Sequence, residues 1–213
     1  MNETSPPTEQ TRWATLGDLE SWSNLAHARR CVERFVAPCG ASAGYREEVL
    51  DFIDTHPDAL HRSCLTGHLT GSSWVVDHGG GRGLVLFHTK VQRWLQPGGH
   101  ADGEANLARV ALLEAAEETG IEGLRVWTDP VDVDIHLFVN RSGPEPDHLH
   151  LDLRFAVQAP EGAVVQGNHE SEELRWVLPD ELDGPDLDLD ASTRRLASRG
   201  FGVVRQQIEA STR

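Results

Sequence analysis

The chain has 213 residues, of which 25% are charged and 38% hydrophobic, and its formal net charge is −15 at pH 7. A charge of that sign repels nucleic-acid backbones and anionic membranes, so neither is expected as the main partner, and no apolar run approaches the roughly 20 residues of a membrane span. The three cysteines cannot all pair and none stands in a CxxC motif, which argues against a disulfide framework or a thiolate zinc site and favours a reducing, cytoplasmic setting.

The first third of the chain predicts a polar segment followed by helices. Residues 1–14 are mostly polar and contain proline, and we expect them to be a disordered lead-in. Apolar residues then recur at helical spacing over 16–35, and a second helix is predicted over 45–54. We therefore expect an N-terminal helical extension over 15–64, followed by the main domain over 65–213.

The middle of the chain has the pattern of β-strands. Two short apolar runs, Ser73–Asp77 and Leu84–His88, flank the turn sequence HGGGRG, which is a hairpin signal. Two later segments, 131–140 and 148–157, alternate apolar and polar residues, as strands with one buried face do. Residues 174–177 are a further candidate strand.

Two more helices are predicted around these strands. The stronger runs from Leu107 to Thr119 and has Gly120 as a C-terminal cap. The other runs from Ala191 to about Ile208, with a break expected at Gly200 and Gly202. Strands, a helix, antiparallel strands and a helix in this order predict an α+β fold that is layered around a mixed sheet.

Three glutamates share one face of the stronger helix. Glu114, Glu117 and Glu118 are spaced i, i+3 and i+4 and fall within a sector of about 100°. Carboxylates so close repel one another, whereas a hard divalent cation such as Mg²⁺ or Mn²⁺ prefers oxygen ligands. A solvated acidic face is the alternative interpretation. Gly98 and Gly99 precede this helix, and glycines allow backbone carbonyls to approach a ligand closely.

The stretch from Gly99 to Ile121 resembles the Nudix box, G-x5-E-x7-R-E-U-x-E-E-x-G-U, in which U is apolar. The matching positions are Gly99, Glu114, Ala115, Glu117, Glu118, Gly120 and Ile121. The resemblance extends from about His68 to Pro179 and includes RWLQPGGHADGE, HLDLRF and EELRWV. It implies the Nudix α/β/α sandwich around a mixed sheet, here with an N-terminal helical extension.

The box departs from the family pattern at two positions. Ala105 stands where the first box glutamate is expected, with Glu104 one residue earlier, and Leu113 stands where the family has arginine. In the family that arginine pairs with and orients the helix carboxylates, which leucine cannot do. The alternative to an active hydrolase is therefore a catalytically weakened Nudix-fold domain that binds nucleotides or regulates. The isopentenyl diphosphate isomerase branch is disfavoured, because no cysteine lies in the expected active-site setting.

The resemblance implies metal-dependent hydrolysis of a phosphoanhydride bond in a nucleoside diphosphate linked to another group. Water attacks phosphorus, and Mg²⁺ or Mn²⁺ is the cofactor. The implied metal ligands are Glu114, Glu117, Glu118 and the Gly99 carbonyl. Glu114 and Glu118 also carry catalytic roles. Glu170, in the loop NHESEEL, is a candidate base, although an exposed loop acid is the more common identity of such a residue.

Several residues near the glycine pair are candidates for contact with the phosphorylated, nucleotide-type small molecule that the family implies. We assign His100, Arg93 and Gly98 to substrate binding. Trp94 and Trp127 are able to stack on a base, but tryptophans more often pack against their own protein.

Two later histidines have the spacing of a chelating pair. His148 and His150 share a strand face with Asp152, and such a pair is able to bind a metal or a phosphate. A solvated sheet face is the simpler interpretation, and we adopt it. The N-terminal helices suit either a substrate lid or the surface of a homodimer, and no nearby sequence feature chooses between these roles.

Overall fold

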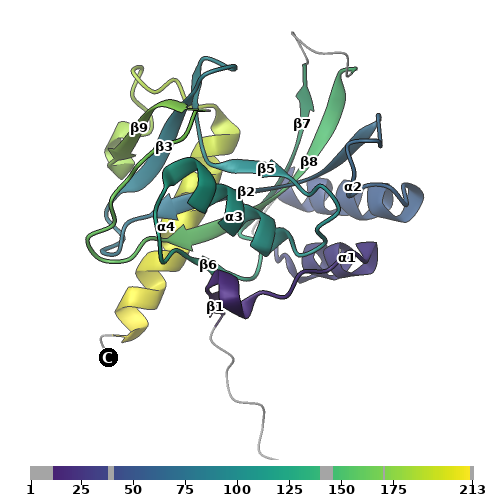
Figure 1. The fold of residues 1–213 in the computed structure, drawn as a ribbon, viewed down its shortest axis with the longest axis horizontal. Coiled ribbons are helices and arrows are strands. Elements are labelled where there is room, and N and C mark those ends of the chain that lie inside the picture. The colour runs from purple at the N-terminus through teal and green to yellow at the C-terminus, as the bar shows by residue number, and fades with distance from the viewer. Residues whose placement is uncertain (1–11, 38–40, 140–145, 170, 212–213) are drawn as a thin grey trace, which may run out of the picture.

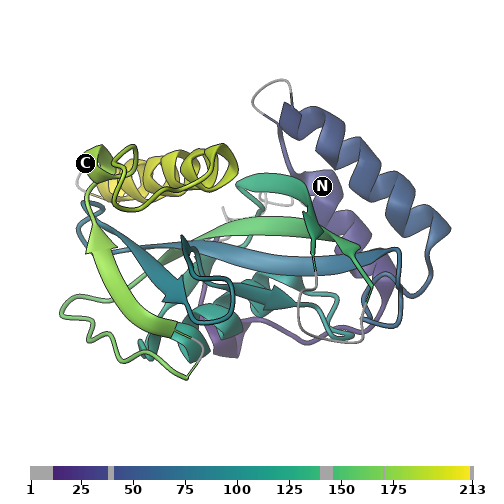
Figure 2. The same ribbon diagram turned by 90° about the horizontal axis from the view of Figure 1, so that it is seen from above.

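A mixed β-sheet runs through the centre of the molecule and carries helices on both faces (Figures 1 and 2). The computed structural model describes residues 12–37, 41–139, 146–169 and 171–211. Within these residues the sheet has nine strands, which confirms the predicted α+β architecture. None of the described helices is both long enough and apolar enough to cross a membrane.

The strands are β1 (Trp13–Ala14), β2 (Gly67–Val76), β3 (Gly83–His88), β4 (Arg93–Leu95), β5 (Gly98–His100), β6 (Arg125–Trp127), β7 (Asp132–Phe138), β8 (His148–Gln158) and β9 (Ser171–Val177). Their order is β1-β6-β8-β2-β3-β4, while β5, β7 and β9 pair with β2, β8 and β3 respectively. The pair β2 and β8 is parallel over its whole length, and the other pairs are antiparallel. The centre of the sheet is therefore built from segments about 80 residues apart in the chain.

The helices are α1 (Leu25–Arg34), α2 (Ala41–Thr55), α3 (Leu107–Thr119) and α4 (Ala191–Ser211), with two short 3₁₀ helices, η1 (Leu16–Asp18) and η2 (Pro179–Glu181). Figure 2 shows α3 on one side of the sheet and α4 on the other. Alternate residues of β8 divide between these layers: Leu153 and Phe155 join the core that includes α3, and Ala156 joins the core under α4. Val32 of α1 and Ile53 of α2 belong to the same core as α3.

The helix predicted over Leu107–Thr119 has these same bounds in the structure, and Gly120 ends it with φ of 65°. The break predicted in the last helix is wrong, because α4 continues through Gly200 and Gly202. Gly200 lies directly against the sheet, where a Cβ atom would come within 2.8 Å of the Trp74 Cβ. Close packing, rather than a break in the helix, accounts for this glycine.

The N-terminal segment differs from its prediction in two ways. The single helix expected over 16–35 is instead η1 followed by α1, which begins after Asn24, whose side chain accepts a hydrogen bond from the amide of Ala26. Trp13–Ala14, expected to belong to the disordered lead-in, pair with β6 and are buried. The rest of that lead-in, residues 1–11, lies outside the described residues.

Candidate functional site

Strand β5 places two glycines against two glutamates of α3. The amide of Gly98 donates a hydrogen bond to Oε2 of Glu118 over 2.9 Å, and Glu118 is only 4% exposed. A Cβ atom on Gly99 would come within 2.3 Å of the carboxyl carbon of Glu114. A side chain at position 99 would require that carboxyl group to move. Glu117 is exposed on the same helix, so the glycine pair lies against two of the three helix glutamates.

The local sequence explains how α3 comes to lie there. Its start is capped by the side chain of Asn106, and its buried face includes Leu107 and Ala111. Gly71 of β2 lies under the helix, where a Cβ atom would come within 2.9 Å of the Leu107 carbonyl oxygen. The missing side chain lets the helix backbone approach the sheet closely, so that the carboxylate end of α3 reaches β5.

Glu104, the residue next to the missing box glutamate, has a different set of contacts. Its Oε1 accepts hydrogen bonds from the amides of Trp22 and Asn106, each over 2.8 Å, and its Oε2 lies 3.4 Å from Nε of Arg109. These contacts hold the N-terminal segment against the start of α3. Ala105 is fully buried, so the position of the missing glutamate is a packed one.

Two arginines near the box, Arg109 and Arg93, form ion pairs with acidic residues outside α3. Besides Glu104, Arg109 reaches the carbonyl oxygen of Leu19 over 3.4 Å. Arg93 lies on β4, with its guanidinium 3.6 Å from the carboxylate of Asp188. Leu113 itself is half-buried on α3.

The other candidates from the sequence are distributed as follows. Arg93 and Trp94 line one shallow cavity at the edge of the sheet, together with residues 186–188. Trp127 packs edge-on against Trp13 with ring centroids 5.6 Å apart, which makes it a packing residue. Glu170, the candidate base, lies outside the described residues.

Four histidines, His68 of β2, His100 of β5, and His148 and His150 of β8, form a second constellation, which we call the histidine cluster. One ring nitrogen of each lies within 4.8 Å of those of the other three. The Nε2 of His150 is 3.2 Å from Nε2 of His148 and 3.3 Å from Nε2 of His100. The cluster lies on the sheet face opposite α3, because His68 and His150 alternate with Leu69 and Leu151, which belong to the α3 core.

The prediction that His148 and His150 line a solvated sheet face is wrong. His68, His148 and His150 are 2%, 4% and 8% exposed. The ring of Phe138 stacks on His150 with centroids 5.0 Å apart, and β5 brings His100 to the same face. The alternation along β8 showed that these histidines share a face, but it did not show what covers that face.

Burial also determines the protonation of the cluster. Burial, together with the neighbouring histidines, lowers the pKa of His150 to about 2, and burial together with Arg62 and His68 lowers the pKa of His100 to about 4. The pKa of His68 is lowered by burial and by His148. These three imidazoles are therefore neutral near pH 7, with one ring nitrogen of each available as a ligand.

Beyond the histidines, the same face carries a buried network of ion pairs. Its members are Asp132, Asp134, Asp152, Arg154, Arg195 and Arg199. Three carboxylates face three guanidinium groups, so the charges balance without a ligand. Arg154 of β8 lies 3.2 Å from Asp134 of β7, and Arg195 of α4 lies 2.7 Å from the same carboxylate. The network anchors α4 to the sheet.

The comparisons with known proteins agree with this architecture. The family model of the NUDIX domain matches residues 70–199, which include β5 and α3. An Ap4A hydrolase of C. elegans in a binary complex is 17% identical, with 65% of this chain and 98% of that chain covered and a TM-score of 0.51. A Nudix hydrolase from M. smegmatis, RenU, is 20% identical, with 68% and 88% covered and a TM-score of 0.45. No curated protein matches the sequence.

Proposed function

Since the chain belongs to the Nudix family of pyrophosphohydrolases, we propose that its substrate is a nucleoside diphosphate linked to another group, and that Mg²⁺ or Mn²⁺ is the cofactor. The observation that carries this proposal is the contact of the α3 glutamates with the glycines of β5. This contact places the two parts of the box side by side: a cluster of carboxylates and a glycine backbone that a ligand can approach.

The donor atoms fit a hard divalent cation. Glu114, Glu117, Glu118 and the carbonyl of Gly99 are assigned as ligands, and all of them offer oxygen, which Mg²⁺ and Mn²⁺ prefer. The hydrogen bond from Gly98 holds the carboxylate of Glu118 in one orientation, as a ligand must be held. When bound, the metal would neutralise substrate phosphates and lower the pKa of a water molecule.

The residues of this chain would then orient the substrate and accept a proton. Because Gly98 and Gly99 carry no side chain, the backbone of β5 passes close to Ser72 and to the Glu114 carboxyl group, where a Cβ atom would collide. Glu114 or Glu118 would accept a proton from the attacking water, with Glu170 as the alternative base. Arg93 is assigned to the far part of the substrate, next to Trp94. His100, the remaining substrate candidate, directs its ring into the histidine cluster.

A net charge of −15 supports the need for the cation. A phosphorylated small molecule and this protein repel each other unless positive charge lies between them. The C. elegans neighbour is a hydrolase of Ap4A, which is consistent with a nucleotide-type substrate.

The test is turnover of a panel that includes dinucleoside polyphosphates, nucleotide sugars and nucleoside triphosphates in the presence of Mn²⁺. The variant Glu117→Gln/Glu118→Gln should lose at least about 100-fold in kcat/KM and should lose its Mn²⁺ site, which we expect to have micromolar to millimolar affinity. Glu122→Gln is the control, because it removes one exposed negative charge just beyond α3. Equal turnover by the wild type and the double variant would contradict the proposal.

The second candidate is a Nudix-fold domain that binds nucleotides with little or no turnover. Leu113 favours it, since leucine cannot orient the carboxylates, and so does Glu104, whose contacts hold the N-terminal segment. Nucleotide binding by the wild type in the presence of Mn²⁺, with no hydrolysis of any compound in the panel, would establish this function in place of the enzyme.

A further inference from the structure

We propose that the histidine cluster is a second metal site, separate from the glutamates, that binds one transition-metal ion with Zn²⁺ as the best match. Its first support is the distance between donor atoms. Zn–N bonds are about 2.0–2.1 Å long, so the nitrogens of a tetrahedral site are about 3.3–3.4 Å apart. The Nε2 atoms of His148 and His100 lie 3.2 and 3.3 Å from Nε2 of His150, close to that separation.

The second support is the state of His68. This side chain is 2% exposed, and neither of its ring nitrogens makes a hydrogen bond of normal geometry with another described residue. A buried polar group without a partner costs about 1–3 kcal/mol. His68 nevertheless lies among three other histidines, with ring centroids 4.6 Å from His148 and 4.9 Å from His100. The backbone of Cys64 interacts with the His68 ring without a hydrogen bond of normal geometry, and a bound cation would give the ring a full partner.

The third support is the orientation of His148. Its Nδ1 lies 2.9 Å from the carbonyl oxygen of Pro146, which makes Nδ1 the protonated nitrogen and directs the lone pair of Nε2 into the cluster. Histidines that bind metals commonly donate their second N–H to a carbonyl in this way.

The ligand set selects the ion. Four imidazole nitrogens suit Zn²⁺, Cu²⁺ or Ni²⁺, whereas Mg²⁺ and Mn²⁺ prefer the oxygens of the α3 glutamates. Four protein ligands in a mostly buried site leave no open position, which is typical of a structural zinc site. Through His100 the ion would tie β5 to β2 and β8, and β5 is the strand whose glycines contact Glu114 and Glu118. Zinc in the cluster would therefore hold the glycine strand in place beside the carboxylates.

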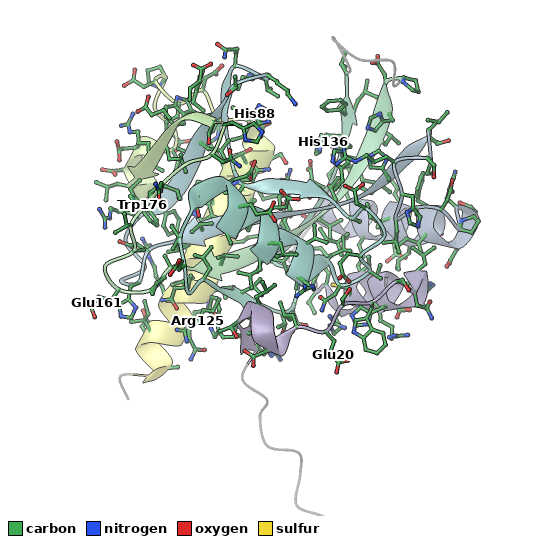
Figure 3. All side chains as sticks on the ribbon, in the orientation of Figure 1. Glu20, His88, Arg125, His136, Glu161 and Trp176 are labelled. Carbon is green, nitrogen blue, oxygen red and sulfur yellow. The ribbon has the colours of Figure 1, made fainter. Side chains whose placement is uncertain are left out.

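The experiment uses the full chain, stripped with a chelator and then titrated with Zn²⁺ against a coloured competitor. The wild type should bind one equivalent, and binding should weaken by at least about 100-fold in His150→Gln and in His68→Gln, because even loss of an outer partner costs 10–100-fold. His136→Gln is the matched control. His136 lies opposite His150 in the sheet, is labelled in Figure 3, and is not one of the four ligands.

The variant Glu117→Gln/Glu118→Gln distinguishes this site from the glutamate site. It should still bind one equivalent of Zn²⁺ tightly, but it should no longer bind Mn²⁺. Co²⁺ in the wild type gives a readout that needs no variant: the cluster should produce the strong visible absorption of four-coordinate Co²⁺. No stoichiometric binding of Zn²⁺ by the wild type would overturn the proposal, as would undiminished binding in the histidine variants. If those variants fail to fold, the weak spectrum of six-coordinate Co²⁺ in the wild type would overturn it equally.

Discussion

The amide of Gly98 donates a hydrogen bond to the carboxylate of Glu118, 20 residues later in the chain, over 2.9 Å. Beside this pair, Glu114 occupies the space that a side chain on residue 99 would need. The strand β5 and the helix α3 therefore act as one unit, in which backbone position and carboxylate position depend on each other.

Gly99→Ala should disrupt the packing of β5 against the glutamates of α3. The new methyl group would lie about 2.3 Å from the carboxyl carbon of Glu114, so the carboxylate must move. A displacement of about 1 Å in a catalytic group costs on the order of 100-fold in rate, and we expect a loss of that size in kcat/KM for any substrate that the panel identifies. Gly79→Ala is the control, because nothing lies within 4 Å of a Cβ atom there. Circular dichroism should show both variants folded. Full activity in Gly99→Ala would show that Glu114 is not needed in its present position.

Leu113→Arg should restore the family pattern. Residue 113 lies one helical turn before Glu117 and next to Glu114, so an arginine there is able to make charge-assisted hydrogen bonds to a carboxylate. We expect kcat to rise about tenfold, equivalent to about 1.4 kcal/mol of barrier. Leu113→Met, of similar volume and without charge, should leave kcat unchanged. A wild type that turns over rapidly, together with an inert or destabilised Leu113→Arg, would show that the site does not need this cation.

Two glycines of α4 should respond oppositely to alanine. Inside a helix, alanine is more favourable than glycine by about 0.8–1.0 kcal/mol. Gly202→Ala should show this gain in the free energy of unfolding, because nothing lies within 4 Å of its Cβ position. Gly200→Ala should instead destabilise the protein, because the methyl group would lie 2.8 Å from the Trp74 Cβ, and overpacking typically costs about 1–3 kcal/mol. Urea unfolding of both variants makes the comparison, and equal gains would contradict the close packing of α4.

The buried ion network should make stability fall in acid. Burial raises the pKa of Asp134, but the hydrogen bond from His136 and the charge of Arg154 outweigh it, so the pKa lies well below its ordinary value. A carboxylate with a depressed pKa stabilises the fold above its unfolded pKa of about 3.9, and this contribution is lost as pH falls through the folded pKa. The free energy of unfolding should therefore decline from about pH 4 downward.

Asp134→Asn tests this directly. It should lower stability at pH 7 by about 3 kcal/mol or more, because Arg154 and Arg195 lose a partner, and should make the acid decline shallower. The control is Asp183→Asn, since the Asp183 side chain is 87% exposed beside Arg194 and a surface pair contributes little. Urea unfolding between pH 3 and pH 7 provides the measurement. Parallel pH profiles for wild type and Asp134→Asn would contradict the assignment of the acid decline to Asp134.

The sequence by itself determined the elements whose information is local. The end of α3 follows from its cap at Gly120, and the common face of its glutamates follows from 3.6 residues per turn. The strands β7 and β8 are long enough for their alternation to be visible. The strands β4, β5 and β6 have three residues each, too few for any periodicity, and they were missed.

Only the tertiary structure decided which of these elements meet. Alternation along β8 predicts that His148 and His150 share a face, but not which strand lies beside them. The parallel register of β2 and β8 places His68 opposite His150, 82 residues later, and β5 brings in His100 opposite Thr70. Such pairings depend on packing between segments distant in the chain, which leaves no trace in local periodicity. The glutamate face was therefore visible in the sequence, whereas the histidine cluster exists only in the fold.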